Sequence, residues 1–485
     1  SESSAYQTSS PTFTDNEVVL YSTLPSASSS ITYEITIRNV GNSDAIVDYL
    51  YTSSNSSLVQ YKISGINATE VISRVTDVTV TVVVEPSINS GNANNIESSL
   101  GLNFSFLKYS DTYSNDCTLS WDGSSSSEPV SSDINGRSYY QVTNANEFKW
   151  FIDQVNSGNT SINVMLNNNI CLNNNAFTAI GTNSAYTGIF DGQNRSISGI
   201  SFFRDGTLKE DTTYSVGLFM NNAGTIKNVN ITNVNIVAGN YIGAVAGGNE
   251  GTITNVIVTG GKIKGNEYIG GIVGNMIAGR ISQCISNLNL NGNNIVGGIA
   301  GNNLGVIEKS YSKGNIYAIS NGAGLVSLNL GTVLNCFSVS NVETVEDSGA
   351  GLIVETNGVV ENCYAIGKVK NGNDGAGLTS AGNAVVNSYW VKELSKKSGS
   401  FSGSEKTVVE LLNEKTYENW DFTTVWEIQE GKSFAYLKGM AVPDEILEVN
   451  LDYAEEMNGE GTKENPYIIM NAKQLAAIIN NLDAH

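Results

Sequence analysis

The sequence predicts an all-β protein with two units: an immunoglobulin-like β-sandwich over residues 12–108 and a parallel β-helix over residues 136–392. Three observations predict this architecture. Residues near the N-terminus alternate polar and apolar with a period of two. A glycine-flanked apolar phrase recurs about every 27 residues through the middle of the chain. Asn, Ser, Thr and Gly dominate while only 6 of the 485 residues are proline, a composition typical of short strands and turns.

The N-terminal unit is predicted from alternation alone. Runs such as "SSITYEITIRNVG" and "VTDVTVTVVVEPS" place apolar residues at every second position, with turn residues between the runs. Short strands at this spacing are typical of sandwiches, and we expect about seven of them. Ser- and Asp-rich sequence over residues 109–135 is expected to link the sandwich to the next unit.

The β-helix is predicted from two repeated phrases. The first runs apolar-Gly-x-apolar and begins, in clear and then degenerate form, at Val216, Ile242, Ile269, Val296, Gly322, Gly349 and Gly375. The second contains a column of small residues spaced 25 to 28 positions apart, at Val229, Val256, Cys284, Ser310, Cys336, Cys363 and Ser388.

A fixed period of this length indicates stacked units that cannot bury a core alone. The runs lack a helical period, so we expect parallel strands stacked about 4.8 Å apart. The glycines are expected to allow tight corners, and the apolar residues between them to fill the interior.

Both ends of the rod are predicted to carry caps. "NANEFKWFIDQVN" has apolar residues at Phe148, Phe151, Ile152 and Val155, which form one face of a short helix over the first turns. At the other end, residues 393–440 break the period. The aromatic residues of this end are expected to plug the open core, with a carbohydrate-binding platform as the alternative: Trp390, Trp420, Trp426, Phe434 and Tyr436.

The end of the chain repeats its own lead-in. "YQVTNANEF", from Tyr140, returns as "YIIMNAKQL", from Tyr467. Residues 441–485 are therefore interpreted as a linker and the start of a second, truncated β-helix module. Since the chain begins without Met, we expect it to be a segment of something longer.

Cysteine and histidine usage restricts the chemistry. The five cysteines are widely spaced, which is not the pattern of a disulfide scaffold. Cys336 and Cys363 should be neighbours in one column, and a buried thiol ladder is expected, with a disulfide or a metal site as alternatives. The single histidine is His485, so histidine-based zinc sites and Ser-His or Cys-His catalysis have no residues to use.

Charge restricts the partners. The chain has 26 basic and 47 acidic residues and a net charge of -21, which argues against nucleic acid and anionic membranes. No apolar run is long enough to span a bilayer. Acidic residues on the rod are scattered, and the densest group is expected to be a solvated edge. Glu346, Asp347 and Asp374 are the alternative, as ligands for Ca²⁺. Asp191 and Gly192, in "FDGQNRS", predict a turn.

The repeats resemble a known family. "GGIVGNMIAGRISQCIS" and "GGIAGNNLGVIEKSYS" resemble the GLUG-motif repeat of large bacterial surface and secreted proteins, and the lead-in and the closing "WDFTTVWEI" are similar to those of such arrays. The resemblance covers about residues 116 to 440. It implies a right-handed parallel β-helix at a bacterial cell surface or secreted from it. "SITYEITIRNVGNSDA" resembles immunoglobulin-like domains of surface proteins more weakly.

The resemblance also supplies an alternative function. GLUG arrays occur beside the catalytic domain of immunoglobulin A1 zinc metallopeptidases, which need an HExxH helix that this sequence does not contain. No catalytic or cofactor-binding residue is therefore carried over. The sequence predicts a non-catalytic segment of a large bacterial surface protein, an adhesin or stalk, monomeric as a segment, whose partner is a host or matrix protein or glycan. An accessory region of such a metallopeptidase and a β-helix carbohydrate-active enzyme are the alternatives.

Overall fold

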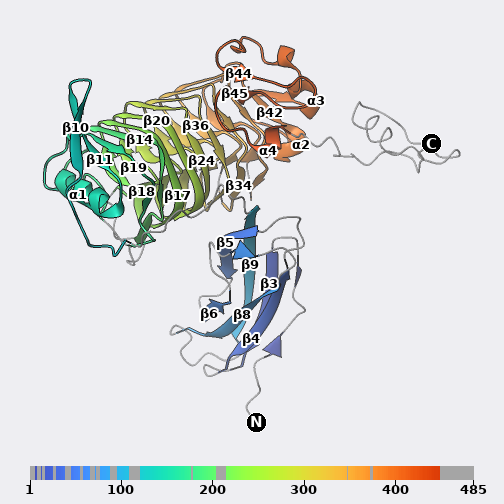
Figure 1. Cartoon of the computed structure of the whole chain (residues 1–485). Helices are drawn as coiled ribbons and strands as arrows, with labels where there is room; N and C mark the ends of the chain where they lie inside the picture. Colours follow the sequence, from blue (N-terminus) through green and yellow to red (C-terminus); the bar gives the residue numbers. More distant parts are fainter. Residues whose placement is uncertain are drawn as a thin grey trace.

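The computed structural model describes residues 6–7, 12–13, 17–25, 29–38, 45–54, 58–65, 71–72, 77–87, 96–108, 121–175, 178–203, 215–346, 348–371 and 375–447. The protein is all-β, and its main body is a β-solenoid of about 9 turns, coloured from teal to orange in Figure 1. The second module expected within residues 441–485 lies, from residue 448 onward, outside the described part of the chain.

The N-terminal unit consists of two antiparallel sheets. One has the strand order β1-β3-β9-β5-β7 with β2 beside β3, and the other has the order β4-β8-β6. The strands are β1 (Tyr6–Gln7), β2 (Thr12–Phe13), β3 (Glu17–Leu24), β4 (Ile31–Arg38), β5 (Ala45–Ser54), β6 (Val59–Ser64), β7 (Val71–Ile72), β8 (Asp77–Pro86) and β9 (Ile96–Lys108). Alternate residues Val80, Val82 and Val84 of β8 share one buried cluster with Leu20 of β3 and Leu100 of β9, so the two sheets enclose a common core.

The rod begins earlier than residue 136. Strands β10 (Val130–Ile134) and β11 (Arg137–Val142) form an antiparallel hairpin, and β11 then pairs in parallel with the first turn. Trp121 is buried in the rod core, so within the predicted 109–135 linker both Trp121 and strand β10 belong to the rod. The expected helix is present as α1 (Ala145–Asn156), whose apolar face is buried over the first turns.

Three sheets of parallel strands form the walls of the rod. The longest continues from β11 through β12 (Val164–Leu166), β13 (Ile170–Cys171), β14 (Ile189–Ser198), β15 (Ser201–Phe203), β17 (Thr225–Val237), β20 (Thr252–Lys264), β23 (Arg280–Ser282), β24 (Ile285–Gly292), β27 (Val306–Glu308), β28 (Tyr311–Lys313), β29 (Asn315–Ala318), β32 (Thr332–Leu334), β33 (Phe337–Ser338), β34 (Asn341–Thr344), β37 (Val359–Glu361), β38 (Tyr364–Ala365), β39 (Val369–Asn371), β42 (Tyr389–Val391) and β43 (Ser404–Lys406).

The second sheet contains β16 (Phe219–Asn222), β19 (Ala246–Asn249), β22 (Val273–Met276), β26 (Ala300–Asn303), β31 (Val326–Asn329), β36 (Ile353–Thr356) and β41 (Thr379–Gly382). The third contains β18 (Asn240–Gly243), β21 (Glu267–Gly270), β25 (Asn294–Gly297), β30 (Gly322–Ala323), β35 (Gly349–Ala350) and β40 (Gly375–Ala376). The chain closes with α2 (Lys392–Ser395), α3 (Val408–Leu411), the 3₁₀ turn η3 (Glu414–Thr416), β44 (Trp426–Glu427), β45 (Tyr436–Leu437) and α4 (Asp444–Leu447).

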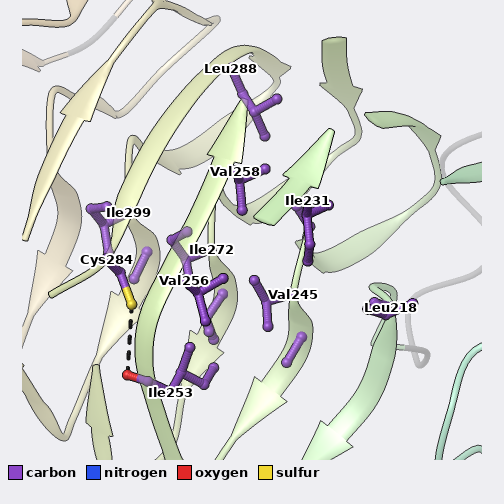
Figure 2. Close-up of a cluster of buried hydrophobic side chains, with 14 of the residues drawn as sticks. Leu218, Ile231, Val245, Ile253, Val256, Val258, Ile272, Cys284, Leu288 and Ile299 are labelled. Atoms are coloured by element: carbon purple, nitrogen blue, oxygen red, sulfur yellow. Dashed lines mark hydrogen bonds between the residues drawn. The ribbon is translucent and has the colours of Figure 1, made fainter. Parts of the chain in front are cut away.

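Neighbouring turns pair in register, so equivalent residues stack along the rod. One interior column runs through six successive turns, each member at most 2% exposed: Ile226, Ile253, Ile281, Ile307, Val333 and Val360. Figure 2 shows Ile253, Val256 and Val258 of β20 gathered with Val245 and Ile272 in this interior. The parallel β-helix predicted from the repeat is therefore confirmed.

The glycines of the repeated phrase have a different role from the one predicted. Gly271, Gly298 and Gly324 do not have the left-handed backbone of a tight corner. A Cβ atom on Gly271 would lie 1.9 Å from Ser286 Oγ, and one on Gly324 would lie 2.3 Å from Ser338 Oγ. The carbonyl oxygen of the next turn is equally close, since Gly351 O would lie 1.9 Å from a Cβ atom on Gly324. These positions lack a side chain because the opposite wall and the next turn together fill the space.

Asparagine and other non-glycine residues make the left-handed corners instead. The residue before the predicted small-residue column has φ between 44° and 54° in seven successive turns, at Asn228, Asn255, Gln283, Lys309, Asn335, Asn362 and Asn387. Asparagine tolerates this backbone better than most residues because its short side chain forms local hydrogen bonds. Asn255 Nδ2 donates to Asn228 Oδ1 at 2.9 Å, so the corners of adjacent turns also bond to each other.

Candidate functional surface

The proposed calcium site lies mostly outside the described residues. Glu346 is exposed after β34, and Asp347 and Asp374 lie outside the described residues. Glu343, three residues before Glu346, accepts a hydrogen bond from Lys370 Nζ at 2.7 Å. Within the described ranges, no group of three or more His, Cys, Asp or Glu side chains could hold a metal ion.

The predicted column of small residues lines the interior of the rod. Cys284, Cys336 and Cys363 are buried and free, so the alternative of a disulfide between Cys336 and Cys363 is wrong. Burial raises the pKa of Cys284 to about 12, and burial together with the neighbouring Cys363 raises the pKa of Cys336. Thiols held neutral in this way pack as small apolar groups and do not act as nucleophiles.

Serine takes the place of cysteine in two turns of this column, and its hydroxyl group accepts a hydrogen bond from a backbone amide of the neighbouring turn. Ser310 Oγ accepts from the Cys284 amide at 3.0 Å, and Ser388 Oγ accepts from the Cys363 amide at 3.1 Å. The Sγ atom of Cys284 itself lies 3.7 Å from the Ile253 carbonyl oxygen, the contact drawn in Figure 2. The column is thus a packing feature of the rod with its polar atoms paired internally.

Sequence reasoning missed one disulfide. Cys171, in β13, takes part in a disulfide bond. Of the remaining cysteines, Cys117 lies outside the described residues. The wide cysteine spacing gave no signal for this bond, because Cys171 does not belong to the repeated column and a single bond leaves no spacing pattern.

The "FDGQNRS" segment, predicted as a turn, lies within strand β14, where the pairing with β17 shifts register between Asp191 and Arg195. Asp191 is 6% exposed, and its carboxylate accepts from Lys227 Nζ, from the Gln193 amide and from Asn228 Nδ2, at 3.0, 3.0 and 3.1 Å. Burial alone would raise the pKa of Asp191, but the ion pair and the hydrogen bonds outweigh it and lower that pKa. Gln193, at this irregularity of β14, has a left-handed backbone with φ of 49°.

Charged residues on the outer face pair across adjacent turns. Arg280 Nε donates to Glu308 Oε1 at 3.1 Å, and Ser282 Oγ donates to the same oxygen at 3.0 Å. Lys227–Asp191 and Lys370–Glu343 are further pairs of this kind. Each of these carboxylates lies beside a cation of an adjacent turn, so the pairs link the turns to each other.

The aromatic residues of the C-terminal end fall into two groups. Trp390, 2% exposed, belongs to the interior of the last turn, where it plugs the core as predicted. The other four belong to a second buried cluster and are between 0% and 8% exposed: Trp420, Trp426, Phe434 and Tyr436. None of the five offers an exposed ring face, so the carbohydrate platform alternative is not supported by these residues.

The second cluster lies along the side of the rod. An outward column on successive turns carries Ile257, Ile285, Tyr311, Phe337, Tyr364 and Tyr389. The rings of Tyr311 and Phe337 stack with centroids 4.6 Å apart, and those of Phe337 and Tyr364 with centroids 5.2 Å apart. Trp426 packs onto this stack, 6.2 Å from the Phe337 ring.

We call residues 407–447 the lateral clamp. Hydrogen bonds fix it to several turns: Tyr311 Oη donates to the Ala441 carbonyl at 2.8 Å, and Tyr364 Oη donates to the Ala435 carbonyl at 2.6 Å. Trp420 Nε1 donates to the Asn387 carbonyl at 2.9 Å. In Figure 1 this segment, orange to red, lies against the last turns. The sequence did contain a signal for the lateral clamp. In most turns an apolar residue directly follows the small-residue column, and an outward column of apolar residues requires a cover.

Comparisons with known proteins identify no relative: no family model, no curated protein and no solved structure matches the chain. Among the described residues, no helix is both long and apolar enough to cross a membrane.

Proposed function

We propose that this chain is a non-catalytic segment of a large bacterial cell-surface protein, in which the rod is a stiff stalk that presents a binding surface to a host or matrix protein or glycan. The observation that carries the proposal is the lateral clamp, which joins successive turns of the rod from outside. The resemblance of the repeats to GLUG arrays adds support from sequence, and it also leads us to propose a right-handed coil and an immunoglobulin-like sandwich.

The clamp matters because of the direction of the hydrogen bonds in the rod. Strand-to-strand bonds of a β-solenoid run along the rod axis, so axial tension would load them one turn at a time. Tyr311 and Tyr364 stand two turns apart in the stacked column, yet both donate to the same covering segment. Separating these turns therefore requires the clamp to be removed as well, which suits a stalk under load.

The cysteine chemistry fits an extracellular setting. Disulfides persist in oxidising compartments, and Cys171 is disulfide-bonded. The three free thiols of the described chain are fully buried, where oxidants in the medium do not reach them.

Surface labelling of the source cells tests the proposal. An antibody raised against the purified rod is expected to label intact cells, and brief protease treatment of those cells should remove the label. Labelling only after the cells are opened would overturn the surface role. The purified chain is then screened against immobilised matrix proteins and glycans.

Intact mass and terminal peptide sequencing of the native polypeptide separate this function from its alternatives. Continuation into an HExxH-bearing domain would favour the accessory region of a secreted metallopeptidase. Release of reducing sugars from a polysaccharide panel by the purified chain would favour a carbohydrate-active enzyme. The stalk predicts neither result.

A further inference from the structure

One corner of the rod exposes large apolar side chains on three successive turns. This corner follows each strand of the second sheet. On each turn, the backbone amide of the residue at the tip donates to a carbonyl oxygen of the preceding turn, that of the residue just before its tip. The Leu304 amide donates to the Met276 carbonyl at 2.8 Å, and the Leu330 amide to the Asn303 carbonyl at 2.8 Å. The Asn357 amide donates to the Asn329 carbonyl at 2.9 Å. The successive tip residues are Ala223, Glu250, Ile277, Leu304, Leu330, Asn357 and Asn383.

Ile277, Leu304 and Leu330 form what we call the apolar ridge. They are 42%, 47% and 47% exposed, whereas the neighbouring tips are small or polar. The rod does not need apolar residues there, since Glu250 and Asn357 occupy the same position with the same backbone hydrogen bonding. Aligned exposed apolar residues bounded by polar ones mark an interaction surface.

An acidic side chain lies near each end of the ridge. Glu250 is exposed at the tip of the turn that precedes Ile277. Glu355 is also exposed and pairs in register with Leu328 of the preceding turn. Neither carboxylate forms an ion pair with a lysine or arginine in the described ranges. The chain's net charge of -21 disfavours a second copy as the occupant and favours a cationic partner.

A buried acceptor without a donor lies beside the ridge. Asn302, 9% exposed on the second sheet, donates from Nδ2 to Asn275 Oδ1 at 2.9 Å. Its own Oδ1 has no hydrogen-bond partner among the described residues, because the next side chain in that column is Leu328. An unpaired buried acceptor is costly, and a donor from a docked partner would satisfy it once Leu328 moves aside.

The spacing of the ridge selects the shape of the partner. Neighbouring turns of the rod lie about 4.8 Å apart, so the three tips extend over about 10 Å. An α-helix laid along the rod presents apolar residues on successive turns about 5.4 Å apart. An extended strand presents same-face residues about 6.6 Å apart and loses register with the ridge sooner.

We propose that the apolar ridge is a docking surface for a basic amphipathic helix of another protein, with the apolar stripe of the helix on Ile277, Leu304 and Leu330 and its basic residues toward Glu250 and Glu355. The inference rests on the proposed presenting function, of which it names one binding surface. Its test uses the purified chain alone, so its failure leaves the surface-labelling result unaffected, and the reverse also holds.

The probe is a synthetic amphipathic peptide of about 18 residues, or five helical turns, with Leu on one face and Lys on the other. A twin with Glu in place of every Lys has the same apolar face. We expect the full chain to bind the Lys peptide in a fluorescence-anisotropy titration, more weakly as salt rises, and to bind the Glu twin at least about tenfold more weakly.

The variants assign binding to the ridge. Leu304→Asn with Leu330→Asn introduces the residue that the chain itself uses at Asn357 and Asn383, so the rod should keep its melting temperature. This double variant should bind the Lys peptide at least about tenfold more weakly. Val345→Asn removes a residue that is 48% exposed at a different corner and should leave binding unchanged.

Three results would overturn the proposal. They are equal binding of the two peptides, unchanged binding by the double variant, and a dimer in sedimentation that the double variant converts to monomer. The last would show that a second copy occupies the ridge.

Discussion

Gly377 and Trp390 share one space between opposite walls of the last turn of the rod. A Cβ atom on Gly377 would lie 2.0 Å from Cε3 of the Trp390 indole. Earlier turns repeat the pairing with smaller partners, such as Gly324 with Ser338 and Gly351 with Ala365. The last turn has the largest partner because its interior must be filled where the regular stack ends.

Gly377→Ala should therefore destabilise the rod, since the added methyl group meets a buried indole that has no room to move. We expect a loss of about 1 to 3 kcal/mol in the free energy of unfolding, the usual range for overpacking. Urea titration followed by tryptophan fluorescence measures it. Gly399→Ala is the matched control, because no atom lies within 4 Å of a Cβ atom at Gly399. Equal stability of the two variants would contradict this account of the glycine.

The repeat period predicted the stacking well, because in a β-solenoid one sequence period is one turn. The register follows directly, as the pairing of Val229 with Val256 shows. Each side chain's environment is harder to predict, since it depends on the facing wall. Gly271 looked like a corner residue because glycine is common in corners, and only the opposing Ser286 reveals its role.

Asparagine corners were present in the sequence but were not recognised as left-handed. Asn255, with φ of 51°, is exposed and bonds to Asn228.

The predicted aromatic cap was found, but much of it covers the side of the rod. A covering segment packs against whichever outer column of the rod is apolar, here the column of Tyr311, Phe337 and Tyr364. The sequence reveals that column only after the inward-facing column has been identified.

Asn255→Ala should destabilise the rod by about 1 to 2 kcal/mol, because alanine has no local hydrogen bond to offset the left-handed backbone. Asn255→Gly should cost less, since glycine adopts this conformation freely. Thr254→Ala, at the neighbouring position of β20, is the control and should have a small effect. The order of denaturation midpoints tests the claim. Equal losses for alanine and glycine would show that the amide ladder to Asn228 matters and the backbone does not.

Tyr364→Phe should loosen the lateral clamp. The hydroxyl group is buried and donates to the Ala435 carbonyl at 2.6 Å, so its removal leaves a buried acceptor unpaired. We expect a loss of about 1 to 2 kcal/mol and faster proteolysis within residues 407–447. Phe337 already fills the preceding position of the stack, so the ring itself should be accommodated.

Tyr139→Phe provides the matched control for the clamp. Tyr139 is half-buried in β11, and its hydroxyl has no hydrogen bond to a residue in the described ranges. The Tyr139 variant should keep the proteolysis pattern of the parent chain. Unchanged proteolysis in the Tyr364 variant would argue that the clamp is held by apolar packing alone.

Alkaline pH should destabilise the rod partly through Cys284. Burial raises the pKa of this thiol from 9.0 to about 12, so the folded state holds it neutral where the unfolded chain ionises it. The contribution to stability is full below pH 9 and is lost as the pH rises toward 12, by up to about 1.4 kcal/mol per pH unit.

Cys284→Val places at this position the residue found at Val256 and Val229, the preceding positions of the column. The variant should match the parent chain near pH 7 and lose stability less steeply above pH 9. Urea midpoints measured from pH 7 to 11 test this, and the difference between the two proteins removes the shared effect of the buried tyrosines. Parallel curves would contradict the raised pKa of Cys284 in the folded rod.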